Sequence, residues 1–500
     1  MSIKKLAGQT LWYGVSSIFA KFINYLLTPY LTFKFLEETY GEMSVMYAAI
    51  PFLNVIFTYG METAYFRFSN KQHNKADVFH TSMISLLGST VVLTTLLILL
   101  RHPLADLLQL SRYPEFITLS AIIIGLDALT AIPFAKLRQD ERPVKYAMVR
   151  IGGILLNIAA LYFFVSVCPK LSANDPDGLI AQYYRRDWAV GYVLLANLIQ
   201  AAFTALLLLK EFQSLRFRFN VALWKEMMLY SAPLIIAGFG GMINETLDRI
   251  MLLRWVPAAT EAAAKAEVGT YSAVYKLSIL ITLAVQAFRM GAEPFFFKQA
   301  SSGNAPNVYA RVMKFFVITL CIMFLFVMLY LDVLKYFIQN PDMYRGLHIV
   351  PILLFANIFL GIYYNLSIWY KLSNKTSPGA WITIIGAVVT IIINYFFIPR
   401  YGFLACAWAH FFCYGSMMVI SYFWGQNNYP VPYNVGKLSV YMALAAIWWA
   451  VFNLIDDSVN HLLLRLAIGT LFLLAYIAII LYNERRELGA LSIVGKRLGK

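Results

Sequence analysis

The sequence predicts an all-α polytopic membrane protein with fourteen transmembrane helices. Hydrophobic residues make up 60% of the 500 residues and charged residues only 13%, and the mean hydropathy of +0.65 lies far from that of a soluble domain. The apolar residues gather in runs of about 20, the length at which a helix crosses ~30 Å of hydrocarbon. Most basic residues lie in the short loops between runs, so the net charge of +15 indicates an inner-membrane protein rather than a nucleic-acid partner.

The first apolar run covers residues 9–33. Two lysines precede it, as in a signal peptide, but the run is too long, contains Lys21, Asn24 and Pro29, and has no convincing cleavage site. We therefore predict that it is the first span. The other thirteen spans are predicted at residues 43–66, 79–100, 115–135, 147–167, 189–209, 227–253, 268–292, 312–332, 347–369, 378–398, 402–424, 437–455 and 462–482.

The distribution of lysine and arginine predicts the orientation. The side that carries both termini holds 24 of the 41 basic residues, the other side holds 12, and five lie within spans. Because cytoplasmic loops are rich in these residues, we expect both termini in the cytoplasm of a bacterial cell. No connection is long enough for a folded extramembrane domain. The two longest outer loops are residues 169–188 and residues 257–267, the second containing a short helical spacer at residues 261–265.

Two sequence matches indicate an internal repeat. Residues 60–67 and 291–298 share the pattern G-x-E-x-x-aromatic-Phe-basic, and residues 136–139 (KLRQ) match residues 371–374 (KLSN). Each match pairs one span with the span six later, and because six is even, both halves share one orientation. We therefore expect Glu62 to correspond to Glu293 and Lys136 to Lys371.

The repeat predicts two parallel six-helix lobes followed by two further helices. The first lobe is expected at residues 1–215 and the second at residues 216–430. The last two spans and a basic cytoplasmic tail occupy residues 431–500.

The seventh and eighth spans carry charges that hydrocarbon should reject. One charge at mid-depth costs ~2.5–3.5 kcal/mol, so several in each span indicate a polar interior. Glu245 and Arg249 share one helix face, and Arg289 and Glu293 share another. Pro233 and nearby glycines are expected to break the seventh span. The charged residues of these spans are Glu245, Asp248, Arg249, Lys276, Arg289 and Glu293.

Two further segments carry a family resemblance. Residues 269–276 read GTYSAVYK, and residues 394–402 read NYFFIPRYG, followed by small residues. Together with the six-plus-six-plus-two plan, the chain resembles the multidrug/oligosaccharidyl-lipid/polysaccharide exporter superfamily, and within it the polysaccharide-biosynthesis flippases. The resemblance implies export of an undecaprenyl-pyrophosphate-linked glycan by alternating access. It also implies a central cationic cavity lined by the first, second, seventh and eighth spans.

Cations within the spans are candidates for binding the pyrophosphate. Arginine suits this group best because its planar fork binds two oxygens at once. The candidate substrate-binding residues are Lys21, Asn24, Arg249, Lys276 and Arg289. Arg249 is the weaker candidate because two neighbouring acids can neutralise it, and structural ion pairs between helices remain the alternative for all four cations. Tyr25, Tyr47 and Tyr275 could stack on sugars.

Five acids are candidates for coupling or gating: Glu62, Asp127, Glu245, Asp248 and Glu293. Asp127 has no basic residue within a turn, so it could carry a proton, help to bind Na⁺, or form an interhelical hydrogen bond. Glu62 and Glu293 lie near the predicted cytoplasmic ends, as members of a gate or as solvated helix ends. His410 and the four cysteines are expected to pack in the interior. Their spacing indicates neither a disulfide nor a metal site, and no cofactor is expected.

We predict a monomeric flippase, not an enzyme, that serves surface polysaccharide or cell-wall assembly among membrane lipids and glycan assembly enzymes. A lipid II flippase, a cation-coupled multidrug exporter and a membrane glycosyltransferase or polymerase are the alternatives. A drug exporter should have an acid-dominated cavity, whereas cations outnumber Asp127 at mid-depth here. A glycosyltransferase would need a larger loop than residues 169–188, whose charged residues include Asp175, Asp177, Arg185 and Arg186.

Overall fold

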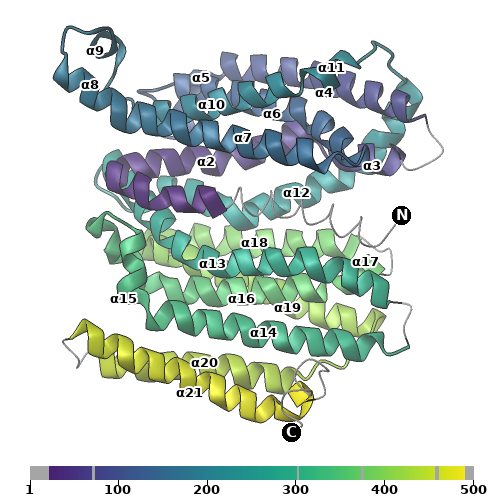
Figure 1. Cartoon of the computed structure of the whole chain (residues 1–500), viewed down its shortest axis with the longest axis vertical. Helices are drawn as coiled ribbons and strands as arrows, with labels where there is room; N and C mark the ends of the chain where they lie inside the picture. The colour runs from purple at the N-terminus through teal and green to yellow at the C-terminus, as the bar shows by residue number, and fades with distance from the viewer. Residues whose placement is uncertain (1–21, 70–73, 301–302, 373–376, 457–460, 490–500) are drawn as a thin grey trace. The chain divides into compact units, whose positions relative to one another are not determined.

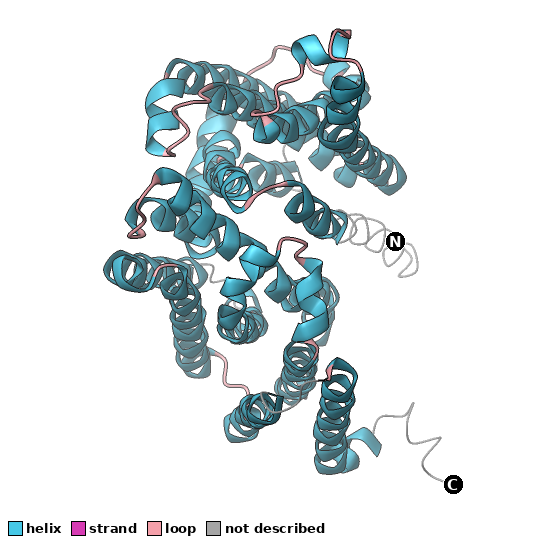
Figure 2. Cartoon of the chain, turned by 90° about the vertical axis from the view of Figure 1, so that its left-hand side faces the viewer, coloured by secondary structure: helices cyan, strands magenta, loops and turns pink. Residues whose placement is uncertain are grey.

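Every regular element that the computed structural model describes is a helix (Figures 1 and 2). The structure describes residues 22–69, 74–300, 303–372, 377–456 and 461–489. Thirteen helical segments in these ranges are long and apolar enough to cross a membrane. They coincide with the predicted second to fourteenth spans, which confirms the polytopic membrane fold. The first predicted span lies largely outside the described residues, and its described part is helical from residue 22 to residue 34.

The first half of the chain supplies the helices that precede residue 215. They are α2 (Glu37–Thr58), α3 (Met61–Ser69), α4 (Lys75–Leu99), α5 (Arg101–Leu107), α6 (Glu115–Gln139), α7 (Pro143–Tyr162), a π-helical turn (Phe163–Val167), α8 (Cys168–Asn174), α9 (Leu179–Tyr183), α10 (Ala189–Leu207) and α11 (Leu209–Gln213). Between α2 and α3 the backbone enters the left-handed region at Tyr59 and Gly60, with φ of 32° and 70°. These two residues break the second span, and glycine adopts such a conformation without strain.

The remaining helices follow residue 220. They are α12 (Val221–Trp255), α13 (Glu261–Gln299), α14 (Ala305–Leu329), α15 (Leu331–Leu334), two 3₁₀ segments (Lys335–Phe337 and Pro341–Ile349), α16 (Val350–Leu366), α17 (Ile368–Leu372), α18 (Ser377–Tyr401), α19 (Phe403–Asn428), α20 (Val435–Asp456) and α21 (Leu462–Gly489).

The chain divides into two compact units. The first comprises the described residues up to Ser272 together with Gly379–Ala409. Within it α4, α6, α7 and α10 pack side by side, and α12 lies along α2 and α3. One hydrophobic cluster joins α3, α4, α6 and α12 through residues such as Met61, Met83 and Met227, all fully buried. The lobe boundaries expected from the repeat stay a prediction.

The second unit comprises Ala273–Pro378 and the described residues from His410 onward. Its centre is α14, which packs against α16, α20 and α21. The carboxylate of Glu484 on α21 is buried and accepts hydrogen bonds from Lys314 Nζ (2.7 Å) and Tyr441 Oη (2.5 Å). Lys437 Nζ lies 2.6 Å from the same carboxylate. These contacts tie the two C-terminal helices to α14.

Two expectations about the helices are wrong. The seventh span is not broken, because α12 is helical from Val221 to Trp255, through Pro233 and its glycines. Glycine serves close packing there: a Cβ at Gly240 would lie 3.1 Å from Thr383 Cγ2 on α18. Residues 261–265 are helical as expected, but they are the first residues of α13 rather than a separate spacer. The expected packing role of the cysteines is confirmed, since all four are buried and free.

Candidate functional site

Asp248 and Arg249 on α12 belong to one buried network. Asp248 is 1% exposed, and its Oδ1 accepts a hydrogen bond of 3.0 Å from Arg249 Nη1. Its Oδ2 accepts a short hydrogen bond from the hydroxyl of Tyr271 on α13. Arg249 Nη1 also donates to the backbone carbonyl of Glu245 (3.0 Å), whereas the Glu245 side chain is exposed. The acid that neutralises Arg249 is therefore its neighbour Asp248, not Glu245.

The same part of α13 crosses α2 at backbone contact. A Cβ at Gly41 would overlap the backbone carbonyl of Lys265, and a Cβ at Gly269 would overlap that of Glu37. Both glycines are therefore required for this approach. Two side-chain contacts reinforce the crossing. Lys265 Nζ lies 2.8 Å from Glu42 Oε1, and Thr270 Oγ1 donates a 3.0 Å hydrogen bond to Glu37 Oε1.

The other candidates in the first unit lie apart from this network. Asn24 is exposed, and Asp127 is exposed on α6, with Arg150 of α7 close enough to act on its charge. Glu62 forms an ion pair with Arg138 of α6 rather than with Arg67. Because Arg138 precedes the predicted inter-lobe boundary, this pair joins helices of one predicted lobe and does not close a gate between lobes.

Arg289 on α13 belongs to the second unit and meets aromatic rings. Its guanidinium carbon lies 4.1 Å from the centroid of the Tyr364 ring on α16. Tyr370 lies within electrostatic reach of Arg289, and its hydroxyl lies 3.4 Å from that of Tyr363. Arg289 is half-buried, so the guanidinium is held in a partly accessible cation–π site.

Lys276 is half-buried on the same helix as Arg289. The two residues are thirteen apart, so an α-helix separates them by about 20 Å along its axis and by about 140° around it. One pyrophosphate group cannot bind both at once on a straight helix. Lys21 lies outside the described residues, and the Glu293 side chain is likewise not described, although its backbone belongs to α13.

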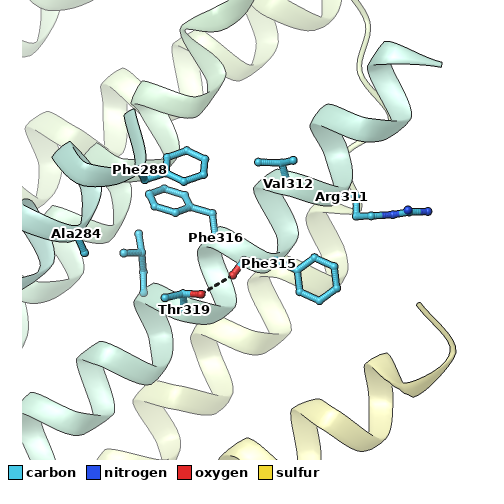
Figure 3. A pocket seen from close by; sticks show the side chains of 8 residues that line it. Ala284, Phe288, Arg311, Val312, Phe315, Phe316 and Thr319 are labelled. Carbon is cyan, nitrogen blue, oxygen red and sulfur yellow. Dashed lines mark hydrogen bonds between the residues drawn. The ribbon is translucent and has the colours of Figure 1, made fainter. Parts of the chain in front are cut away.

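An apolar pocket of about 430 Å³ lies between α13 and α14 (Figure 3). Phe288 and Phe316 stack within it, with ring centroids 3.9 Å apart. Arg311 lines the pocket but points away from the other lining side chains. Its Nε lies 3.7 Å from Glu487 Oε2, so an acid offsets its charge. The pocket suits a hydrocarbon chain and offers little to an anion.

The three tyrosines expected to stack on sugars and His410 differ in their exposure. Tyr25 is buried and Tyr47 is 40% exposed, with its hydroxyl 2.5 Å from Asn197 Nδ2. The Tyr275 ring lies 5.6 Å from the ring of His410, which is 1% exposed. The expectation that His410 is a packed polar residue agrees with this burial. Tyr47 is the more accessible of these tyrosines.

The loop at residues 169–188 is largely exposed and contains most of α8 and all of α9. Its turn formers separate α8 from α9, as expected. Arg112 and Arg185 lie 3.1 and 3.7 Å from Asp187 Oδ2. Although desolvation acts in the opposite direction, hydrogen bonds and these arginines lower the pKa of Asp187. Among the described residues, no three His, Cys, Asp or Glu side chains gather as a metal site requires.

Three contacts of these sites were missing from the sequence expectations: Tyr271 on Asp248, Tyr364 on Arg289 and Lys265 on Glu42. The segment that contains Tyr271 was noticed only for its resemblance to a family motif. No signal in the sequence links Tyr364 to Arg289, because α14 separates their helices in the chain. Lys265 was assigned to a loop.

Family comparisons agree with this architecture. The model of a family described as polysaccharide biosynthesis protein matches residues 6–300, and the model described as MatE matches residues 258–396. No curated protein sequence matches the chain significantly.

Several solved structures share the fold. A lipid II flippase MurJ in an inward closed conformation covers 94% of this chain and 99% of its own, with a TM-score of 0.69 and 14% identity. An inward-facing multidrug resistance MATE family transporter of the MOP superfamily covers 84% of this chain and 94% of its own, with a TM-score of 0.59 and 14% identity. A MOP superfamily transporter from Pyrococcus furiosus, in which the reverse polarity of the binding pocket suggests a different function, covers 84% of this chain and 95% of its own, with a TM-score of 0.54 and 12% identity.

Proposed function

Because this chain belongs to the polysaccharide biosynthesis protein family of the MOP superfamily of transporters and flippases, we propose that it exports an undecaprenyl-pyrophosphate-linked oligosaccharide. The proposed transport is by alternating access across the bacterial cytoplasmic membrane, for surface polysaccharide or cell-wall assembly. Both termini face the cytoplasm in this proposal, in keeping with the excess of basic residues on their side.

The observation that carries the proposal is the setting of Arg289. The guanidinium lies against the face of the Tyr364 ring and is partly accessible, so an anion can reach it. At this position, inside a membrane-spanning helix, it attracts a phosphate strongly and with bidentate geometry. Lys276 provides a second cation at another depth. We therefore propose that the two act in succession as the headgroup moves.

The substrate also needs sites for its sugars and its prenyl chain. Tyr364, beside Arg289, is half-buried and offers a ring face and a hydroxyl to a sugar, whereas the neighbouring Tyr363 and Tyr370 are buried. The apolar pocket between α13 and α14 provides space for part of the prenyl chain (Figure 3). Ala284 and Phe288 line this pocket from α13, which also carries Arg289. One helix thus offers contacts to both ends of such a lipid.

The energy source is a separate proposal. Asp127 and Glu245 are exposed carboxylates on membrane-spanning helices, and either is suited to binding Na⁺ or a proton. Asp248 is a poorer candidate, because Arg249 and Tyr271 already occupy both of its oxygens. We propose no cofactor and no catalytic role, with the protein acting as a monomer beside glycan assembly enzymes.

The sign of the charge at position 289 tests the proposal. Arg289→Lys should weaken translocation of the lipid-linked oligosaccharide through loss of the bidentate fork, and Arg289→Glu should abolish it by repulsion. Transport is measured in proteoliposomes, beside efflux of a cationic dye. Dye efflux that survives Arg289→Glu, with no oligosaccharide transport by the wild type, would replace the proposal with multidrug export. Transport of lipid II in preference to an oligosaccharide-linked carrier would assign the protein to cell-wall precursor export.

A further inference from the structure

A second pocket, of about 450 Å³, lies in the first unit beside the break between α2 and α3. Its walls come from that break, from α4, from the first turns of α12 and from the segment that precedes α12. None of the residues assigned above to transport lines it. Gly88 opens the pocket on α4, since a Cβ added there would meet no atom within 4 Å.

Hydrogen bonds fix the wall of this pocket. Ser85 Oγ accepts a hydrogen bond of 2.9 Å from Trp224 Nε1 and lies 2.7 Å from the hydroxyl of Tyr59. Ser89 Oγ also donates to the Tyr59 hydroxyl (3.3 Å). The break between α2 and α3 is thereby joined to α4 and α12 through polar side-chain atoms, and the remaining lining is apolar. The pocket is preformed and does not depend on a bound molecule for its shape.

A basic and aromatic segment lies along α4 next to the pocket. Residues 216–219 read Arg-Phe-Arg-Phe, both arginines are exposed, and Phe217 is 82% exposed. The backbone N–H of Arg216 donates to His80 Nδ1 (3.2 Å). His80 is eight residues before Gly88, so the segment lies about 12 Å along α4 from the open part of the pocket. Phe219 itself lines the pocket and contacts the Trp224 ring.

The charge around this segment is positive. Arg216 and Arg218 form no ion pair with any residue that the structure describes. The charged groups within electrostatic reach of His80, at the anchor of the segment, include Arg216, Arg218 and Lys136, and the acid Asp77. Positive charge therefore predominates among these groups. This differs from the pocket of Figure 3, where Glu487 offsets the charge of Arg311.

We propose that this second pocket and residues 216–219 bind an anionic phospholipid of the leaflet that the proposed topology places on the cytoplasmic side. One acyl chain fills the pocket at Gly88, and the headgroup phosphate binds Arg216 and Arg218. Phe217 enters the headgroup layer, where aromatic side chains are favoured in membranes. Juxtamembrane arginines attract anionic lipids of this leaflet. The bound chain contacts Tyr59 at the break in the second span, which gives lipid composition a means to regulate transport.

The test uses the purified full chain in detergent, equilibrated with equal amounts of phosphatidylglycerol and phosphatidylcholine. Native mass spectrometry counts the lipids that stay bound. The wild type should retain phosphatidylglycerol preferentially. Arg216→Gln with Arg218→Gln should lower that preference by roughly five-fold per arginine. The matched control is Arg101→Gln with Arg254→Gln, which removes two exposed arginines elsewhere.

The pocket is tested by filling it. Gly88→Leu should reduce retention of both lipids, whereas Thr95→Leu, at an exposed position of the same helix, should not. Met228→Phe narrows the pocket from the α12 side, and it provides a second test if the Gly88→Leu protein cannot be purified. Equal retention by Gly88→Leu, Met228→Phe and wild type would overturn the proposal, as would equal loss of preference in the control arginine pair. A further outcome is that polyprenyl phosphate displaces phosphatidylglycerol from the wild type but not from Gly88→Leu. That result would assign the pocket to the transport substrate instead.

Discussion

Arg249 on α12 and Arg289 on α13 are both half-buried arginines in membrane-spanning helices, yet their surroundings differ. Arg249 contacts the buried carboxylate of Asp248, so the pair carries no net charge. Arg289 contacts the face of the Tyr364 ring and is partly accessible. The difference shows that a cation in a membrane span indicates an anion site only when its partners are known. In the proposed function, Arg249 stabilises the helices and Arg289 binds the substrate.

Asp248→Ala should have the largest effect on folding. It removes the buried carboxylate that neutralises the half-buried Arg249 and accepts the hydrogen bond of the Tyr271 hydroxyl. Breaking a buried pair costs about 3–5 kcal/mol. The midpoint of thermal unfolding in detergent measures the loss. Asp248→Asn is the control, since it keeps an acceptor for Tyr271 and should lose less. An unchanged midpoint in Asp248→Ala would show that the network is not structural.

Two glycines on α13 sharpen the same comparison. Gly269 lies two residues before Tyr271, and a Cβ there would overlap the Glu37 carbonyl, so Gly269→Ala should cost about 1–3 kcal/mol by overpacking. Gly291 lies two residues after Arg289 and has no atom within 4 Å of an added Cβ. Gly291→Ala should therefore leave the midpoint unchanged or raise it slightly. Equal destabilisation by both changes would contradict the described crossing of α2 and α13.

Tyr364→Leu should act on substrate binding rather than on folding. It removes the ring beneath Arg289, and a cation–π contact of this kind contributes about 0.5–2 kcal/mol. We expect the KM for lipid-linked oligosaccharide to rise several-fold with little change in the unfolding midpoint. Tyr364→Phe keeps the ring and should retain most of the affinity. A full loss of folding in Tyr364→Leu would instead place Arg289 in a structural role.

The smallest effect on stability is expected for the charge cluster of Asp332, Lys335 and Arg465. Partial burial acts to raise the pKa of Asp332, but hydrogen bonds from Lys335 (2.7 Å) and Arg465 (2.9 Å) outweigh it and lower the pKa. The resulting stability is present above the ordinary pKa of aspartate, and is lost as the pH falls through the lowered value. We expect this cluster to contribute less than about 1 kcal/mol to the free energy of unfolding, which the pH dependence of unfolding measures. Asp332→Asn should remove this contribution, and an unaltered profile would contradict it.

The fold followed from the sequence because apolar length alone identifies a membrane helix. The predicted spans from the second onward coincide with helices, although several helices extend past the hydrocarbon, as α13 does to Glu261. Pro233 was expected to break α12. A membrane helix tolerates proline, however, because neighbouring groups can satisfy the backbone carbonyl that proline leaves without a hydrogen bond. The family followed from two short motifs and the span count.

The surroundings of the site residues could not be predicted in the same way. The Asp248–Arg249 pair is local and was foreseen as neutralisation of Arg249, because its members are adjacent in sequence. The partners Tyr271 and Tyr364 lie on other helices, and their positions depend on helix rotation and packing. Glu62 was expected in a gate or at a solvated helix end, but it pairs with Arg138, because α6 brings that arginine to α3.

Transport by Arg249→Gln and Arg289→Gln, each normalised to the amount of folded protein in proteoliposomes, tests the central claim most directly. Both changes remove one positive charge and keep a polar side chain of similar length. The account predicts that Arg249→Gln lowers the yield of folded protein but that the folded fraction still translocates lipid-linked oligosaccharide. It predicts normal folding and loss of translocation for Arg289→Gln. Normal translocation by folded Arg289→Gln, with none by folded Arg249→Gln, would contradict the assignment.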